Sequence, residues 1–133
     1  MNEYFDRTLV ADFPQLYRQR SLSMHQTCMN WGFDTGDGWE RLIRDLSQRL
    51  EFLNENAPVH IEAAQVKEKF GSMRFYVNIE GEKPWRDLAY ALIDAAEGRS
   101  AHTCEWCGDW GKQRGGGWIR TLCDKCDEER QAG

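Results

Sequence analysis

Four cysteines in the last third of the chain carry the clearest chemical pattern in the sequence. They form two Cys-x-x-Cys pairs, Cys104 with Cys107 and Cys123 with Cys126, and residues 108–122 separate the pairs. Two intervening residues let one tight turn direct both sulfurs at the same point, so two such pairs suit one tetrahedral ion. We therefore expect a single structural Zn²⁺ ion held by four thiolates, because a catalytic zinc keeps one position free for water or substrate.

Other potential metal ligands are weaker candidates. His25 and Cys28 have a ligand-like spacing without a second pair, and His102 lies two residues before the first cysteine pair. We expect all three to be core, surface or neighbouring residues, with a second metal site at His25 and Cys28 as the less favoured alternative. A disulfide framework is the alternative use of the paired cysteines. The N-terminal sequence lacks the basic start and apolar centre of a signal peptide, which favours the reducing cytoplasm and a metal.

The composition limits the possible partners. The chain of 133 residues has a formal net charge of −5, so its charge demands neither a nucleic acid nor a membrane surface. No apolar run approaches the roughly 20 residues needed to span a bilayer. The sequence also contains six tryptophans. We expect large rings to fill the interior of a small metal module, and an exposed stacking surface is the alternative.

Three helices are predicted to position these residues, at 2–11, 37–54 and 84–97. Asn2 is the predicted N-cap of the first, and Asp37 with Glu40 forms a capping-box pattern in the second. Pro84 begins the third helix and Gly98 is expected to end it. Helical spacing predicts two buried stripes, consisting of Trp39, Leu42, Ile43, Leu46, Leu50 and Leu53 in the second helix, and Trp85, Leu88, Ala89, Leu92, Ala95 and Ala96 in the third.

Residues 59–79 alternate between apolar and polar side chains and predict a β-hairpin. With a tight turn at residues 70–71, the predicted pairs are Ala64 with Val77, Gln65 with Tyr76, Val66 with Phe75, and Lys67 with Arg74. The inward parity reverses near residues 63–64, which predicts a β-bulge there. Lys67 opposite Arg74 is unfavourable by up to about 1 kcal/mol unless an acidic neighbour or a ligand lies between them.

The two cysteine pairs flank a shorter predicted hairpin. Residues 109–113 and 117–122 can pair around the glycine-rich turn at 114–117, and the second cysteine pair opens a terminal helix. A cysteine turn, a hairpin and a helix in this order make a treble-clef-like module. We therefore predict an α+β fold with two parts: a body at residues 1–98, in which a small antiparallel sheet packs with two amphipathic helices, and a zinc module at residues 99–133.

Basic and aromatic side chains gather on both predicted hairpins. Such interleaving is typical of proteins that hold phosphates and stack bases. Against this use, residues 99–133 carry six basic and six acidic side chains, and residues 1–98 carry the whole negative balance. The candidate binding residues are Lys67, Lys69, Arg74 and Tyr76 on the first hairpin, and Trp110, Lys112, Arg114, Trp118 and Arg120 on the second.

Three segments in combination point to a family. They are G-D-G-W at residues 36–39, Q-V-K-E-K-F-G-S-M-R-F-Y at 65–76, and G-G-W-I-R-T-L-C at 116–123. Together they resemble a family of uncharacterised small bacteriophage and prophage proteins with a C-terminal four-cysteine zinc ribbon, over most of residues 24–126. The resemblance implies a phage context and a host-cytoplasm location, and it brings no catalytic residues with it.

No catalytic constellation stands out in the sequence. The chain lacks a Ser/His/Asp signature, a phosphate-binding glycine loop followed by a helix with lysine, and a His-x-Glu deaminase pattern. We therefore predict a non-catalytic, zinc-stabilised binding protein that acts on a host or phage protein, with counter-defence as one such role. The alternative is binding of nucleic acid or a small nucleotide through the two hairpins. A hydrolase or transferase using Asp37, His60 or Glu68 is the third hypothesis.

Overall fold

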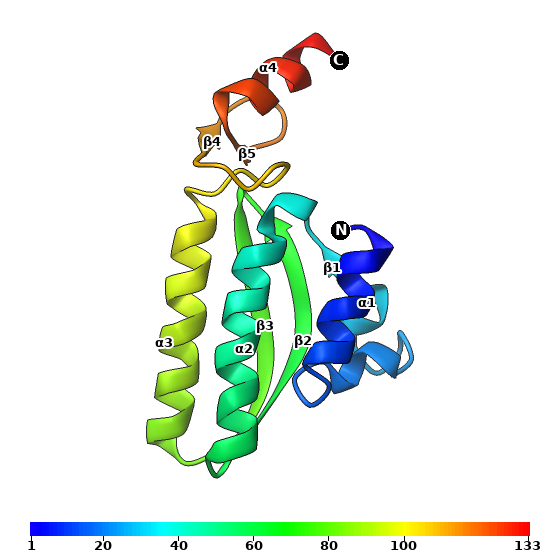
Figure 1. Ribbon diagram of the computed structural model, residues 1–133, viewed down its shortest axis with the longest axis vertical. Helices are drawn as coiled ribbons and strands as arrows, with labels where there is room; N and C mark the ends of the chain where they lie inside the picture. Colours follow the sequence, from blue (N-terminus) through cyan, green and yellow to red (C-terminus); the bar gives the residue numbers. More distant parts are fainter.

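A long antiparallel hairpin forms the centre of the structure, a computed structural model that describes residues 1–133 (Figure 1). Two helices, α2 and α3, lie side by side along this hairpin, and α1 contacts α2. The elements of the body are α1 (Glu3–Asp12), the 3-10 helices η1 (Arg18–Ser21), η2 (Cys28–Trp31) and η3 (Asp37–Trp39), and then β1 (Phe33–Asp34), α2 (Glu40–Asn56), β2 (Val59–Lys69), β3 (Ser72–Gly81) and α3 (Lys83–Ser100).

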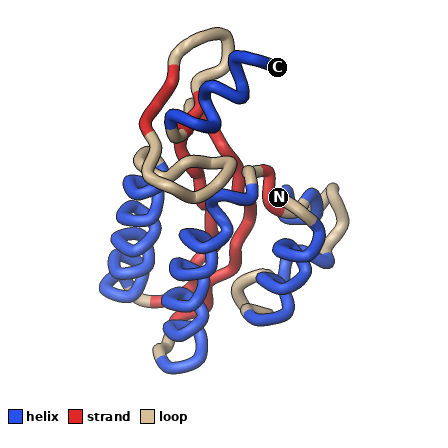
Figure 2. Tube along the Cα trace, turned by 45° about the horizontal axis from the view of Figure 1, so that its top comes forward, coloured by secondary structure: helices blue, strands red, loops and turns tan.

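A second group of elements lies at the turn end of the hairpin. It consists of β4 (Lys112–Arg114), β5 (Arg120–Leu122) and α4 (Asp124–Ala132). Figure 2 shows the two short strands and their connecting loop projecting beyond the long hairpin, with α4 packed beside them. The α+β class is confirmed: a three-stranded sheet in the order β1-β2-β3 carries helices, and a two-stranded sheet follows with the cysteines.

The register of the long hairpin confirms most of the predicted pairs. Gln65 pairs with Tyr76 and Lys67 with Arg74, but Val77 pairs with Ala63, so the predicted Ala64–Val77 pair is wrong. The predicted bulge explains the difference, because the register shifts between residues 63 and 65. This shift turns the buried side chains on both sides of the bulge, Ile61, Ala63 and Val66, towards the same core.

The first two helices begin differently from one another. Asn2 caps α1 as predicted, since its side-chain oxygen accepts a hydrogen bond from the Phe5 N–H at 2.8 Å. The predicted capping box is wrong, because the Asp37 carboxylate accepts the Asn2 N–H at 2.7 Å and Glu40 pairs with Arg44 at 2.7 Å.

The buried face of α2 is confirmed. All six residues of its predicted stripe are buried: Trp39, Leu42, Ile43, Leu46, Leu50 and Leu53.

Helix α3 runs past its predicted end. It continues through Gly98 to Ser100, where the buried hydroxyl accepts a hydrogen bond from the Met73 N–H at 2.8 Å and holds the last turn against β3. The predicted inner face is rotated, since Leu88 is 41% exposed and Ala95 is exposed too. The buried residues of α3 are Ala89, Ile93, Ala96 and Ser100.

The segment between α1 and α2 supplies an edge strand. Phe33 and Asp34 form β1, which pairs in parallel with Val66 and Lys67 of β2. Of the apolar residues in this segment, Met29 and Phe33 are buried, whereas Met24 and Trp31 are exposed. Only part of the segment is therefore held against the body.

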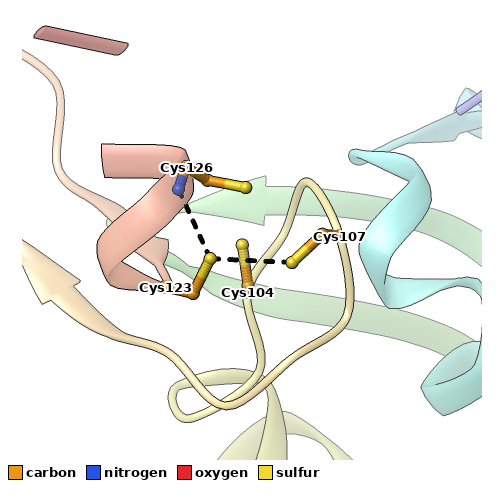
Figure 3. Close-up of side chains that lie close together, drawn as sticks. All are labelled: Cys104, Cys107, Cys123 and Cys126. Atoms are coloured by element: carbon orange, nitrogen blue, oxygen red, sulfur yellow. Dashed lines mark hydrogen bonds between the residues drawn. The ribbon is translucent and has the colours of Figure 1, made fainter. Parts of the chain in front are cut away.

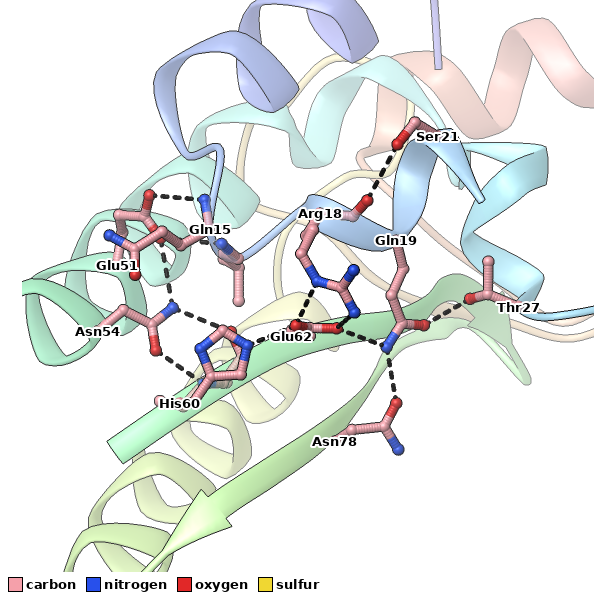
Figure 4. A network of polar contacts seen from close by, with 12 residues as sticks. Gln15, Arg18, Gln19, Ser21, Thr27, Glu51, Asn54, His60, Glu62 and Asn78 are labelled. Atoms are coloured by element: carbon pink, nitrogen blue, oxygen red, sulfur yellow. Dashed lines mark hydrogen bonds and ion pairs between the residues drawn. The ribbon is translucent and has the colours of Figure 1, made fainter. Parts of the chain in front are cut away.

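A polar network around Glu62 fixes the N-terminal segment to the sheet (Figure 4). Arg18 donates two hydrogen bonds to the Glu62 carboxylate, at 2.6 and 3.0 Å, and His60 also contacts it. Gln19 bridges Glu62 and Asn78 across β2 and β3. The Arg18 guanidinium, with His60 and Gln19, outweighs the effect of burial and lowers the pKa of Glu62 to about 2.

Lowering the pH is expected to remove the stability that Glu62 provides. Its folded pKa lies below the ordinary 4.5, so the contribution is complete above about pH 4.5 and is lost as the pH falls from there towards 2. Because Arg18 is solvent-exposed, we expect a loss of about 1 to 2 kcal/mol. Urea unfolding at several pH values should show a smaller acid loss for Glu62→Gln than for the wild type. Glu55→Gln, at an exposed position of α2, should lose as much as the wild type, and equal losses in all three proteins would contradict the prediction.

Candidate metal centre

The first cysteine pair lies in a tight turn between α3 and β4. The Gly108 N–H donates to the Cys104 carbonyl at 2.9 Å and closes this turn. Gly108 has a φ of +88°, a conformation that glycine adopts without strain. The glycine that follows Cys107 therefore lets the chain turn back sharply.

The second cysteine pair lies at the start of α4. Cys123 is the N-cap residue of this helix, and the Cys126 N–H points at the Cys123 sulfur at 3.4 Å. Acidic residues occupy the first turn, which suits the positive end of the helix dipole. Turn, hairpin and helix thus follow one another in the order that the sequence predicts.

The four sulfurs converge on one point (Figure 3). All lie within 4.8 Å of one another. The Cys107 and Cys123 sulfurs are 3.6 Å apart, far more than the length of a disulfide, and all five cysteines of the chain are free thiols. A tetrahedral ion with metal–sulfur bonds of about 2.3 Å separates its ligands by about 3.8 Å, so the cluster can hold a metal ion.

The crowding of the thiols affects their ionisation. Burial would raise the pKa of Cys104, but backbone N–H groups, that of Cys123 first among them, outweigh it and lower the pKa to about 7. Burial raises the pKa of Cys107 to about 11, and it raises the pKa of Cys126, where the neighbouring sulfurs add to the effect. Four thiolates cannot share this space without a cation between them, so the cluster suits a divalent ion chemically.

The cysteine turn is seated directly on the start of α2. The Gly38 N–H donates to the Glu105 carbonyl at 2.8 Å, and the Trp39 indole donates to the Thr103 carbonyl at 2.8 Å. A Cβ atom on Gly38 would lie 2.2 Å from the Cys104 carbonyl oxygen. Only glycine therefore allows the two backbones to approach this closely.

A second attachment joins the module to the tip of the long hairpin. Thr121 donates a hydrogen bond to the Gly71 carbonyl, and Gln113 donates to the Phe70 carbonyl at 3.2 Å. The Trp118 indole donates to the Glu68 carboxylate at 3.2 Å. The module is thus held to the body at two separate places, the start of α2 and the hairpin tip.

The predicted basic residues divide into free and paired groups. Lys67 lies opposite Arg74 as expected, and neither side chain forms an ion pair with a carboxylate. Arg114 pairs with Asp124 at 2.7 Å, and Arg120 pairs with Glu105 at 2.9 Å. These two arginines are therefore neutralised within the module. The remaining candidates, Lys69, Tyr76, Trp110, Lys112 and Trp118, have exposed side chains.

The tryptophans of the module do not fill its interior. Trp106, Trp110 and Trp118 are 39, 70 and 62% exposed, so the expectation of buried rings is wrong there. The buried hydrophobic residues of the module are Cys104, Leu122 and Cys126. Four sulfurs that can hold an ion occupy the place where a hydrophobic core would otherwise lie, and the rings stay on the surface.

One acidic residue that no predicted pattern includes helps to build the site. Glu105, within the first cysteine pair, is almost fully buried and accepts the Gly36 N–H at 2.9 Å. Burial raises its pKa, while the Gly36 N–H and Arg120 oppose that rise. The position of a charged residue, Glu105, between Cys104 and Cys107 was the signal in the sequence that could have identified it. His25, Cys28 and His102 do not belong to the cysteine cluster.

Two further findings concern the chain as a whole. None of its helices is long and apolar enough to cross a membrane. Comparison of the chain with protein-family models, with curated proteins and with solved structures found no match, so the resemblance to phage proteins gains no support there.

Proposed function

We propose that this protein is a non-catalytic binding protein whose C-terminal module is stabilised by one Zn²⁺ ion. The ligands are Cys104, Cys107, Cys123 and Cys126. Soft thiolate ligands in a tetrahedral set favour zinc over magnesium or calcium. Four protein ligands complete the coordination shell and leave no position for water or substrate, which supports a structural role for the ion. With no catalytic role for the metal, binding is the function that we favour.

An exposed apolar surface carries the proposal of a protein partner. Phe70 at the hairpin tip is 64% exposed, and Trp118 and Ile119 of the module are 62 and 40% exposed. Together with Glu68, Lys69, Gly116 and Gly117 they line a hollow of about 350 Å³, which we call the tip hollow. Aromatic side chains grouped around a hollow are typical of the energetic centre of a protein–protein interface. By the resemblance to phage proteins, such a partner would lie in a phage-infected host cytoplasm, where counter-defence is one role.

Nucleic acid or a nucleotide is the second candidate ligand. The unpaired charges of Lys67 and Arg74 on neighbouring strands favour it, because two such cations attract phosphate. The net charge of −5 and the neutralisation of Arg114 and Arg120 oppose it. We therefore favour a protein partner, and the experiment below separates the two.

Trp118→Ser is expected to abolish capture of the partner. Affinity capture from host-cell lysate, with zinc present in all buffers, should recover one protein in stoichiometric amount with the wild type. Trp110→Ser is the matched control, since Trp110 is equally exposed but does not line the tip hollow. With the purified partner, calorimetry should give a dissociation constant about 30-fold higher for Trp118→Ser and nearly unchanged for Trp110→Ser.

Zinc content and an NMR spectrum of each variant establish that it is folded. Equal capture by both variants, or no stoichiometric protein at all, would show that the tip hollow is not the binding surface. Capture that nuclease treatment abolishes would favour the nucleic-acid alternative.

A further inference from the structure

A second hollow lies beside the tip hollow, where the body meets the cysteine turn. It has a volume of about 500 Å³, and we call it the junction cleft. The residues that matter most come from both parts of the chain: Asp34 and Lys67 from neighbouring strands, Glu68 near the hairpin tip, and Trp106, Trp118 and Arg120 from the module. Trp118 lines both hollows, so one partner can occupy both at once.

The charges of the junction cleft leave a negative balance. Arg120 and the buried Glu105, which also lines the cleft, neutralise one another at 2.9 Å. Glu68 accepts the Gly71 N–H at 2.8 Å and the Trp118 indole N–H at 3.2 Å, and it has no cationic partner. Asp34 is exposed and makes no ion pair or side-chain hydrogen bond, and Lys67 is the one remaining cation. Two carboxylates against one ammonium group favour a cationic ligand.

The tryptophan rings favour a flat cation. The guanidinium carbon of Arg120 lies 5.1 Å from the centre of the Trp118 ring, so this ring already binds a guanidinium group of its own chain. Because the ring remains 62% exposed, it has room for a second group. A guanidinium group stacks on tryptophan and donates hydrogen bonds to carboxylates in one plane, which an ammonium group cannot do.

An unsatisfied hydroxyl group supplies an independent observation. Thr35 lines the junction cleft, is 6% exposed, and has a hydroxyl oxygen without a hydrogen-bond partner. Buried hydroxyl groups are nearly always hydrogen-bonded, and an exception calls for a ligand or a water. The oxygen atom itself is closed to the surface, so the cleft must open slightly before an N–H donor of the ligand can reach it.

We propose that the junction cleft binds the guanidinium group of an arginine side chain of the protein partner. The proposal rests on the proposed function, because the same partner would place an apolar side chain in the tip hollow. The arginine stacks against a tryptophan ring and donates hydrogen bonds to Asp34 and Glu68. Lys67 also lines the cleft and disfavours partners that carry further positive charge beside this arginine.

An NMR titration with N-acetyl-L-arginine amide tests this assignment. The probe should shift the backbone signals of Gly36 and Trp106 and the indole signal of Trp118, with a dissociation constant on the order of 10 mM at low salt. The norleucine analogue, which lacks the charge, should leave them unchanged. Asp34→Asn should weaken binding about threefold to fivefold, and Trp106→Leu should weaken it by a similar factor. Asp94→Asn, at an exposed position of α3, is the matched control and should bind as the wild type does.

Three results would overturn the proposal: no shifts with the arginine amide, equal binding of its norleucine analogue, or tighter binding of guanosine monophosphate at the same signals. The last would assign the cleft to a nucleotide. Failure here is distinct from failure of the proposed function. If a partner is still captured through Trp118, the partner stands and only its arginine contact is wrong.

Discussion

Removing the metal ion, or replacing Cys126 by serine, is expected to unfold residues 99–133 while the long hairpin and its helices stay folded. The hydrophobic cluster of the module contains three buried residues, two of them cysteines of the cluster, whereas the hydrophobic core of the body contains 21. Burial of so few apolar side chains cannot offset the conformational entropy that residues 99–133 lose when they become ordered. Structural zinc contributes about 10 to 16 kcal/mol of apparent binding free energy in small zinc-finger peptides, so this effect should be the largest in the protein.

Elemental analysis and amide hydrogen exchange measure this result. The wild type should contain about one zinc per chain, and a chelator should remove the exchange protection of β4, β5 and α4. Cys126→Ser should contain almost no zinc. Cys28→Ser is the control, because Cys28 is exposed and lies outside the cluster. A purified wild type without metal, or with the four cysteines joined as disulfides, would refute the zinc site.

Gly38→Ala should cause the second largest loss. The added Cβ would lie 2.2 Å from the Cys104 carbonyl oxygen and 2.7 Å from the Cys107 backbone nitrogen, so the whole cysteine turn must shift. We expect a loss of at least about 3 kcal/mol in unfolding free energy, because backbone atoms cannot rotate out of the way as side chains do. The shift also displaces two of the four sulfurs, so zinc affinity should fall with stability.

Gly98→Ala provides the matched comparison. Gly98 lies inside α3, and a Cβ there would meet no atom within 4 Å. Alanine is the better helix former by about 1 kcal/mol, so this variant should be slightly more stable than the wild type. Denaturant unfolding and competition with a zinc chelator measure both variants. A Gly38→Ala protein with wild-type stability would mean that the body and the cysteine turn do not touch as described.

Local patterns predict much of this structure from the sequence. The spacing of Cys104, Cys107, Cys123 and Cys126 predicts a convergence of sulfurs, because each pair depends on one short turn. The bulge at residues 63–65 is predicted for a similar reason, since apolar side chains on both sides of it must reach one core. Both features depend on residues that are close in sequence.

Features that depend on distant residues escape the same reasoning. Asp37 and Glu40 match the capping-box pattern in sequence. In the structure, however, the Asp37 carboxylate accepts a hydrogen bond from the Asn2 N–H, 35 positions away. Gly98 is a plausible helix end, yet the hydrogen bond between Ser100 and Met73 extends α3 beyond it. The pairing of Arg120 with Glu105 also follows from the fold alone, because no helical or strand periodicity relates the two.

The composite origin of the tip hollow has a consequence for the timing of activity in the cell. Phe70 belongs to the hairpin, whereas Trp118 and Ile119 follow some fifty residues later in the chain. A nascent polypeptide that has already formed its central hairpin thus still lacks half of the surface. Under the proposed function, binding of the partner would have to wait until residues 118–126 are synthesised and the ion has bound, so the supply of zinc would limit when this protein can act.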